Sequence, residues 1–98
     1  MKAIGDIAII PLGTGLSLSP FVAACEHILE QAGLDPQLHA NGTNVEGEWN
    51  DVMAALKRCH EKLHSMGAIR VATNLRISTR TDKEQSREDK IRSVREKM

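Results

Sequence analysis

The sequence predicts an α+β sandwich, and the order of its elements is the main reason. Apolar runs typical of strands alternate with amphipathic runs typical of helices, in the order strand, helix, strand, strand, helix, strand. Glycine-bearing turns separate them, at Gly13 and Gly15 and at Asn41-Gly42. This order is the split βαβ pattern of a ferredoxin-like βαββαβ sandwich with an antiparallel sheet. In a chain of 98 residues we expect one such domain at 1–80 and a charged C-terminal helix or tail at 81–98.

The first strand and the first helix are the clearest elements. The strand is expected from Ala3 to Leu12, and its isoleucines do not alternate with polar residues, as in a central strand with both faces buried. In the helix that follows, Ser19 is expected to be the N-cap, Pro20 the first helical residue and Gly33 the stop. Its apolar stripe consists of Phe21, Val22, Cys25, Ile28, Leu29 and Ala32.

The centre of the chain predicts a hairpin. Strands are expected at 37–41 and 43–48, and Asn41-Gly42 is typical of a tight turn with positive φ angles. The second helix should begin near Asn50 and stop at Gly67, with its apolar positions directed inward: Val52, Leu56, Cys59, Leu63 and Met66. The last strand, 69–78, alternates apolar and polar residues, so we expect Ile69 and its successors to pack on the helices while the polar face stays open.

The charged tail has the local pattern of a helix. Thr81 and Glu84 match a capping box, and Ile91, Val94 and Met98 form a narrow apolar stripe. Two outcomes remain open for it, a solvated segment or a helix docked on a neighbouring subunit.

Composition excludes several partners. Lys plus Arg equals Asp plus Glu at 13 each, and only two residues are aromatic, so neither a nucleic acid nor an anionic membrane is an expected partner. The charge is nevertheless divided, with −4 in residues 1–66 and +4 in residues 67–98, which favours self-association. Cys25 and Cys59 fall on apolar helix positions, as buried thiols in a cytoplasmic protein would.

One motif suggests a metal-dependent enzyme. His60-Glu61-Lys62-Leu63-His64 has the H-E-x-x-H spacing, which can place two imidazoles on one metal ion. A third ligand and a catalytic cleft are also required, and a small sandwich whose helix buries Cys59 and Leu63 leaves little room for them. Packed or solvated histidines are therefore expected, with a metal site as the alternative.

Two glycine-bearing segments are candidates for ligand binding. The loop after the first strand offers Thr14 and Ser19 near a helix N-terminus. The hairpin offers a carboxylate, an amide, a hydroxyl and an imidazole, from Glu46, Asn41, Thr43 and His39. A carboxylate can accept two hydrogen bonds from an aminopyrimidine, and the other groups can orient it. No nucleophile with a partner base is evident, so catalytic residues are not expected.

These segments resemble the small thiamine-binding protein family. The similarity rests on Ile9-Ile10-Pro11-Leu12-Gly13-Thr14-Gly15, on 38–47 and on 59–67, and it runs from about Gly5 to Lys83. It implies a ferredoxin-like subunit that forms dimers and tetramers through its sheets. It also implies binding of thiamine or hydroxymethylpyrimidine at Thr14, Thr43 and Glu46, without a metal role for the histidine motif.

The expected function is therefore non-catalytic binding of thiamine or a thiamine-like pyrimidine by a cytoplasmic homodimer or homotetramer that needs no cofactor. The alternatives are a metal-dependent enzyme that uses His60 and His64, and a structural or regulatory interaction protein.

Overall fold

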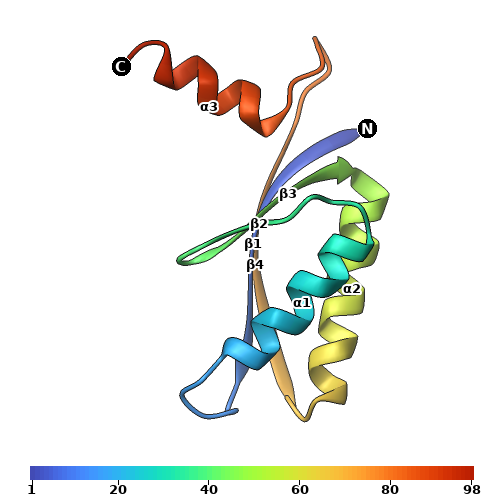
Figure 1. Ribbon diagram of the computed structural model, residues 1–98. Helices are drawn as coiled ribbons and strands as arrows, with labels where there is room; N and C mark the ends of the chain where they lie inside the picture. The colour runs from blue at the N-terminus through green and yellow to red at the C-terminus, as the bar shows by residue number, and fades with distance from the viewer.

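The computed structural model describes all residues, 1–98, and contains one four-stranded sheet with three helices (Figure 1). In chain order the elements are β1 (Lys2–Leu12), α1 (Ser19–Gln31), β2 (Gln37–His39), β3 (Gly42–Glu48), α2 (Trp49–Ser65), β4 (Arg70–Thr79) and α3 (Arg87–Arg95). The strands lie in the order β2-β3-β1-β4, and every neighbouring pair is antiparallel. The predicted ferredoxin-like α+β fold is confirmed.

The sheet has one covered and one open face. In Figure 1 both α1 and α2 lie on the same side of the strands, and the opposite side carries no helix. β1 is an inner strand, as predicted, because it pairs with β3 on one edge and β4 on the other. The prediction that both of its faces are buried is wrong, because α1 and α2 cover only one of them. Its pairing with β3 ends at Ile7, whereas its pairing with β4 continues to Leu12. The second half of β1 therefore has a strand on one side only.

The core fills the space between the sheet and these two helices. Its fully buried side chains come from every layer: Leu29 of α1, Leu34 after it, Val45 of β3, and Val52, Cys59 and Leu63 of α2. Ala55, which the sequence interpretation omitted, is also buried. Met66 was predicted to point inward, but it is 38% exposed, because the helix has already ended at Ser65.

Two predicted details at the start of elements are wrong. α1 begins at Ser19, so its N-cap is Leu18, and no side chain caps it. Ile69 precedes β4 and is 89% exposed instead of packing on the helices. The stops at Gly33 and Gly67 are confirmed by their φ angles of 75° and 103°, which favour glycine.

The β2–β3 hairpin turns one residue earlier than predicted. β2 ends at His39, its turn is formed by Ala40 and Asn41, and neither turn residue has a positive φ. Gly42 is instead required for a close approach, because a Cβ there would lie 2.8 Å from the carbonyl oxygen of Ile7. The glycine thus brings the hairpin against β1.

The tail forms a helix, but not where its pattern suggested. α3 is capped by Ser86, whose hydroxyl accepts a hydrogen bond from the Asp89 N–H, while the Asp89 carboxylate accepts one from the Ser86 N–H. The predicted capping box at Thr81 and Glu84 is wrong. In Figure 1 α3, in red, stands beyond the end of the sheet that holds the N-terminus. None of the helices is both long and apolar enough to cross a membrane.

Candidate functional site

A pocket of about 280 Å³ lies between α1, the second half of β1 and the β2–β3 hairpin. We call it the α1 pocket. It opens beyond Ile7, where β1 is no longer paired with β3, and the absence of a neighbouring strand leaves room for a ligand. Ten of its fifteen lining residues are hydrophobic, and the aliphatic ones include Ile7, Ile9, Leu18, Val22, Leu29 and Leu38. Such a lining with a few polar groups is typical of a small-molecule site.

The pocket has one carboxylate, Glu26 of α1. Its Oε1 accepts a hydrogen bond from the hydroxyl of Thr43, which is 6% exposed on β3. Neither lysine nor arginine lines the pocket, so Glu26 faces no cation there. A ligand that brings amine donors or a positive charge would complement this carboxylate in a mostly apolar enclosure.

Three of the sequence-predicted ligand residues line this pocket: His39, Asn41 and Thr43. His39 also binds outward, because its Nε2 lies 2.7 Å from Oδ1 of Asp6. This contact ties the end of β2 to the central strand and holds one wall of the pocket.

Three other predicted residues lie elsewhere. Ser19 is exposed at the start of α1, and Thr14 sits in the preceding loop with a buried hydroxyl that has no hydrogen-bond partner. Neither residue lines the α1 pocket. Glu46 lies on the opposite face of the sheet from Thr43, where it forms ion pairs with Lys2 and Arg87. The structure therefore does not bring Glu46 together with the rest of the set.

Glu26 is the residue that the sequence interpretation missed. It interrupts the apolar stripe of the first helix between Cys25 and Leu29, one turn after Val22. An acidic side chain on the covered face of a helix needs a partner. That interruption was the signal available in the sequence, although the Thr43 hydroxyl that serves as the partner could not be identified from it.

The two cysteines lie behind the pocket. Both are free and buried, and Cys25 also lines the pocket. The Cys59 thiol donates a hydrogen bond to the backbone carbonyl oxygen of Cys25 at 3.9 Å, and its interaction with the Cys25 side chain lowers the pKa of the Cys25 thiol. The same interaction, with burial, raises the pKa of Cys59 far above its ordinary value. Cys25 is thus the more readily ionised thiol.

The histidines of the H-E-x-x-H segment form hydrogen bonds with neighbouring parts of the chain. His60 Nε2 hydrogen-bonds the hydroxyl of Thr73 on β4, and His64 Nδ1 lies 2.7 Å from the carbonyl oxygen of Ala68. Their ring centroids are 6.4 Å apart in an edge-on arrangement. No group of three or more His, Cys, Asp or Glu side chains is placed to hold a metal ion.

Comparison with known proteins agrees with this architecture. A family model described as thiamine-binding protein matches residues 5–95. A UPF0045 protein from Synechocystis is 47% identical over 94 residues, covering 96% of this chain and 78% of the relative. A UPF0045 protein from the fungus Eremothecium gossypii is 38% identical, covering 95% of this chain and 90% of the relative.

Solved structures share the fold. A hypothetical protein from Methanocaldococcus jannaschii matches with a TM-score of 0.90 and 32% identity, covering 97% of each chain. A protein from Thermotoga maritima, described as a candidate for thiamine biosynthesis or salvage, matches with a TM-score of 0.81 and 20% identity. That match covers 96% of this chain and 99% of the other, and at its identity it shows the fold alone.

Proposed function

The chain belongs to the thiamine-binding protein family, and from this premise we propose that it binds thiamine or a thiamine-like aminopyrimidine in the α1 pocket without transforming it. The observation that carries the proposal is the Glu26 carboxylate, held by Thr43 in a mostly apolar pocket. A flat heteroaromatic ring fits between aliphatic side chains, and its exocyclic amine can donate to the carboxylate. The thiazolium of thiamine would add a positive charge near an unneutralised anion.

The size of the pocket supports a small ligand. Its volume of about 280 Å³ is just below the range of about 300–1,000 Å³ usual for small-molecule sites. A one- or two-ring molecule is therefore favoured over a nucleotide. His39 and Asn41 at the rim supply an imidazole and an amide that can orient the ring substituents.

The residues that line the α1 pocket also favour a binding role over a catalytic one. The lining contains no hydroxyl or thiol paired with an imidazole base: the Thr43 hydroxyl donates to the Glu26 carboxylate, and the Cys25 thiol lies beside another thiol. We place the protein in the cytoplasm, where reducing conditions keep both buried cysteines free. We also propose that it works as a homo-oligomer whose contacts involve the open face of the sheet.

Titration calorimetry and thermal denaturation with thiamine and with hydroxymethylpyrimidine test the proposal. Saturable heat without turnover is expected, together with a higher melting temperature, because the ligand binds only the folded state. Glu26→Gln should weaken binding by about 10- to 100-fold, since a hydrogen bond to a charged group contributes about 1.5–3 kcal/mol. The matched control is Glu30→Gln, which changes an exposed carboxylate one turn further along α1.

Two results would overturn the assignment. The absence of binding heat and of a thermal shift at millimolar concentrations of both ligands would rule out the proposed function. Binding that is equally strong in wild type and Glu26→Gln would remove the α1 pocket as its site.

A further inference from the structure

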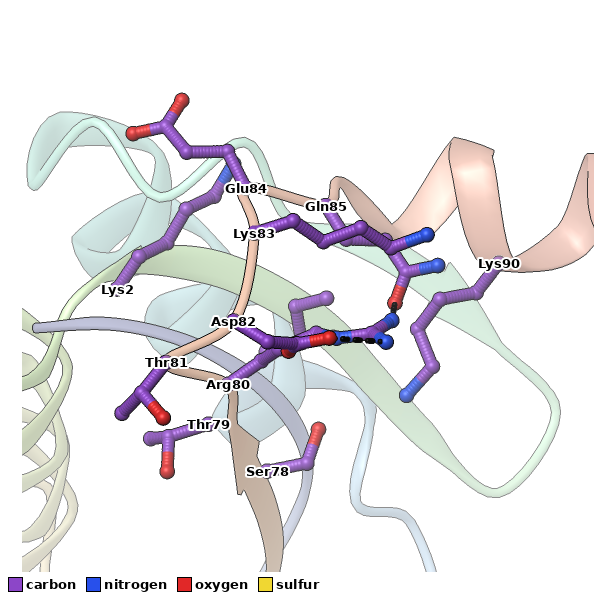
Figure 2. Close-up of a pocket in the computed structure, with 11 residues that line it drawn as sticks. Lys2, Ser78, Thr79, Arg80, Thr81, Asp82, Lys83, Glu84, Gln85 and Lys90 are labelled. Carbon is purple, nitrogen blue, oxygen red and sulfur yellow. Dashed lines mark hydrogen bonds and ion pairs between the residues drawn. The ribbon is translucent and has the colours of Figure 1, made fainter.

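A second cavity, larger than the α1 pocket, lies away from it, where the chain leaves β4 and turns toward α3 (Figure 2). It measures about 650 Å³ and shares no lining residue with the α1 pocket. Only one of its eleven lining residues is hydrophobic. We call it the tail pocket, because its walls are the end of β4, the connection 80–85, Lys90 of α3 and the first residues of β1.

The lining of the tail pocket has a cationic excess. Four bases and two acids contribute, and the one arginine, Arg80, is already neutralised by Asp82 through contacts of 2.5 and 2.8 Å. Lys83 and Lys90 form no ion pair in the structure, while Lys2 lies 3.6 Å from Glu46. The second acid, Glu84, points away from Ser78 and Lys90 in Figure 2. Two ammonium groups thus remain without a counter-charge at the same cavity.

Hydroxyl donors accompany these ammonium groups. Ser78, Thr79 and Thr81 line the same cavity without a hydrogen bond from their hydroxyls within the protein, and of these the Ser78 hydroxyl lies toward Lys90, while those of Thr79 and Thr81 point away from it in Figure 2. In Figure 2 the Lys90 ammonium and the Ser78 hydroxyl lie on the same side of the Arg80–Asp82 pair. Ammonium and hydroxyl donors that come from separate elements are the groups that bind a phosphoryl oxygen.

The cationic surface continues onto the open face of the sheet. Lys90 and Ser78 also line a neighbouring hollow of about 310 Å³, together with Arg76, which has no ion-pair partner. The acid in that hollow, Asp6, is engaged by His39 at 2.7 Å. Lys83, Lys90 and Arg76 therefore border two adjoining hollows, an arrangement suited to an anion with more than one phosphoryl group.

We propose that the tail pocket binds the phosphoryl groups of a small phosphorylated metabolite, and that the bound anion fastens α3 to the end of the sheet. The second part follows from the origin of the donors, because Lys90 belongs to α3 whereas Ser78 belongs to β4. An anion that contacts both bridges two elements, so its binding favours the docked helix over a detached one.

The test uses the full chain and inorganic pyrophosphate as the probe, with inorganic phosphate and sulfate for comparison. Calorimetry should detect saturable binding of pyrophosphate that is stronger than that of either single anion. Hydrogen exchange should show slower exchange of the α3 amides in the bound protein. A phosphorylated organic compound such as ATP, titrated in parallel, distinguishes recognition of the diphosphate alone from recognition of an attached group.

Matched lysine variants locate the site. Lys90→Gln should weaken pyrophosphate binding at least fivefold, and Lys83→Gln combined with it should abolish binding. Lys57→Gln, on an exposed position of α2 with no ion pair, should change nothing. Lys57 and Lys90 are both exposed, so all variants are expected to fold, which circular dichroism checks.

An equal loss in Lys57→Gln and Lys90→Gln would reveal diffuse charge attraction and overturn the site. Binding without any added protection of α3 would overturn the bridging role. Absence of pyrophosphate binding at low ionic strength would overturn the proposal entirely, and it would leave the α1 pocket unaffected because the two cavities share no residue.

Discussion

Arg87 holds Glu46 by two separate contacts, one from its backbone and one from its side chain. The Arg87 N–H donates to Oε2 of Glu46 at 3.2 Å, and its guanidinium Nε lies 3.9 Å from Oε1. The same guanidinium reaches Oδ2 of Asp35 at 2.8 Å and donates to the Asn44 carbonyl oxygen at 3.1 Å. The side chain of Arg87 is 4% exposed, so the basic tail is anchored within its own chain by acids of the N-terminal half.

The first prediction concerns this anchor. Arg87→Ala should release α3, because it removes the guanidinium from the Glu46 carboxylate, whose side chain is 16% exposed, and leaves it only the backbone N–H at 3.2 Å and Lys2 at 3.6 Å. Loss of one member of a buried pair costs about 3 kcal/mol, which corresponds to roughly a hundredfold faster amide exchange in α3. Arg92→Ala is the control, since Arg92 is 64% exposed and pairs only with Asp89. Unchanged exchange in Arg87→Ala would contradict the anchor.

The sequence predicts the face of the sheet on which Glu46 lies, but it does not predict the partner of Glu46. Side chains of a strand alternate between faces, so Thr43 and Glu46, three residues apart, must point in opposite directions. The grouping of both in one ligand site was therefore at odds with the strand that the same sequence predicted. The partnership of Glu46 with Arg87 spans 41 positions, and no local pattern identifies such a partner.

The start of the tail helix likewise depends on contacts with distant residues, which local sequence patterns do not reveal. Thr81 and Glu84 match a capping box as well as Ser86 and Asp89 do, so local pattern could not choose between them. The choice depends on Arg87, because a helix that starts at Ser86 puts its first residue against Glu46 and Asp35. By contrast, the order of elements and the stops at Gly33 and Gly67 depend on local periodicity and backbone preference. These features were predicted correctly.

The second prediction follows from the Asp89 cap. Hydrogen bonds from the backbone N–H and the side chain of Ser86 lower the pKa of Asp89. A carboxyl with a lowered pKa in the folded state stabilises the fold above its unfolded pKa of about 3.9, and this contribution is lost as pH falls through the folded value. Amide protection of α3 should thus decrease in acid more in wild type than in Asp89→Asn, which lacks that titration.

Hydrogen exchange measured at pH 6 and at pH 3, corrected for the intrinsic rate, tests this dependence. Glu88→Gln is the matched control, because its exposed carboxylate makes no cap contact and should leave the wild-type pH dependence intact. Equal acid sensitivity of wild type and Asp89→Asn would show that the cap does not contribute.

The third prediction concerns the thiols behind the α1 pocket. Cys25 lines the pocket, and its interaction with the Cys59 side chain lowers its pKa, whereas Cys59 is fully buried with a raised pKa. Iodoacetamide should therefore modify Cys25 before Cys59 in the folded protein, and Cys59→Ala should slow modification of Cys25. Saturating thiamine should protect Cys25, which peptide mass spectrometry measures. Equal rates for both cysteines would contradict the pKa order, and modification of Cys25 unaffected by thiamine would place the ligand elsewhere.

The last prediction is that the protein is a homo-oligomer held together through the open face of its sheet. Ala8 and Ile10 follow Asp6 on the open side of β1, and Ala72 lies next to Ile10 on β4. Helices α1 and α2 cover the other face of the sheet, so no helix of the same chain packs on this apolar row. A second copy would remove it from water, and a small domain gains much from such burial. Light scattering at micromolar concentration should report a dimer or tetramer for the wild type.

A paired substitution locates the contact. Ala72→Arg should yield the monomer, because a guanidinium at the centre of an apolar interface has no partner there. Ala54→Arg introduces the same group on an exposed position of α2, on the other side of the sheet, and should leave the oligomer intact. A monomeric wild type would defeat the prediction outright. Dissociation by Ala54→Arg, with Ala72→Arg still assembled, would instead put the interface on the helices, and the apolar row on β1 would then face solvent in the assembly.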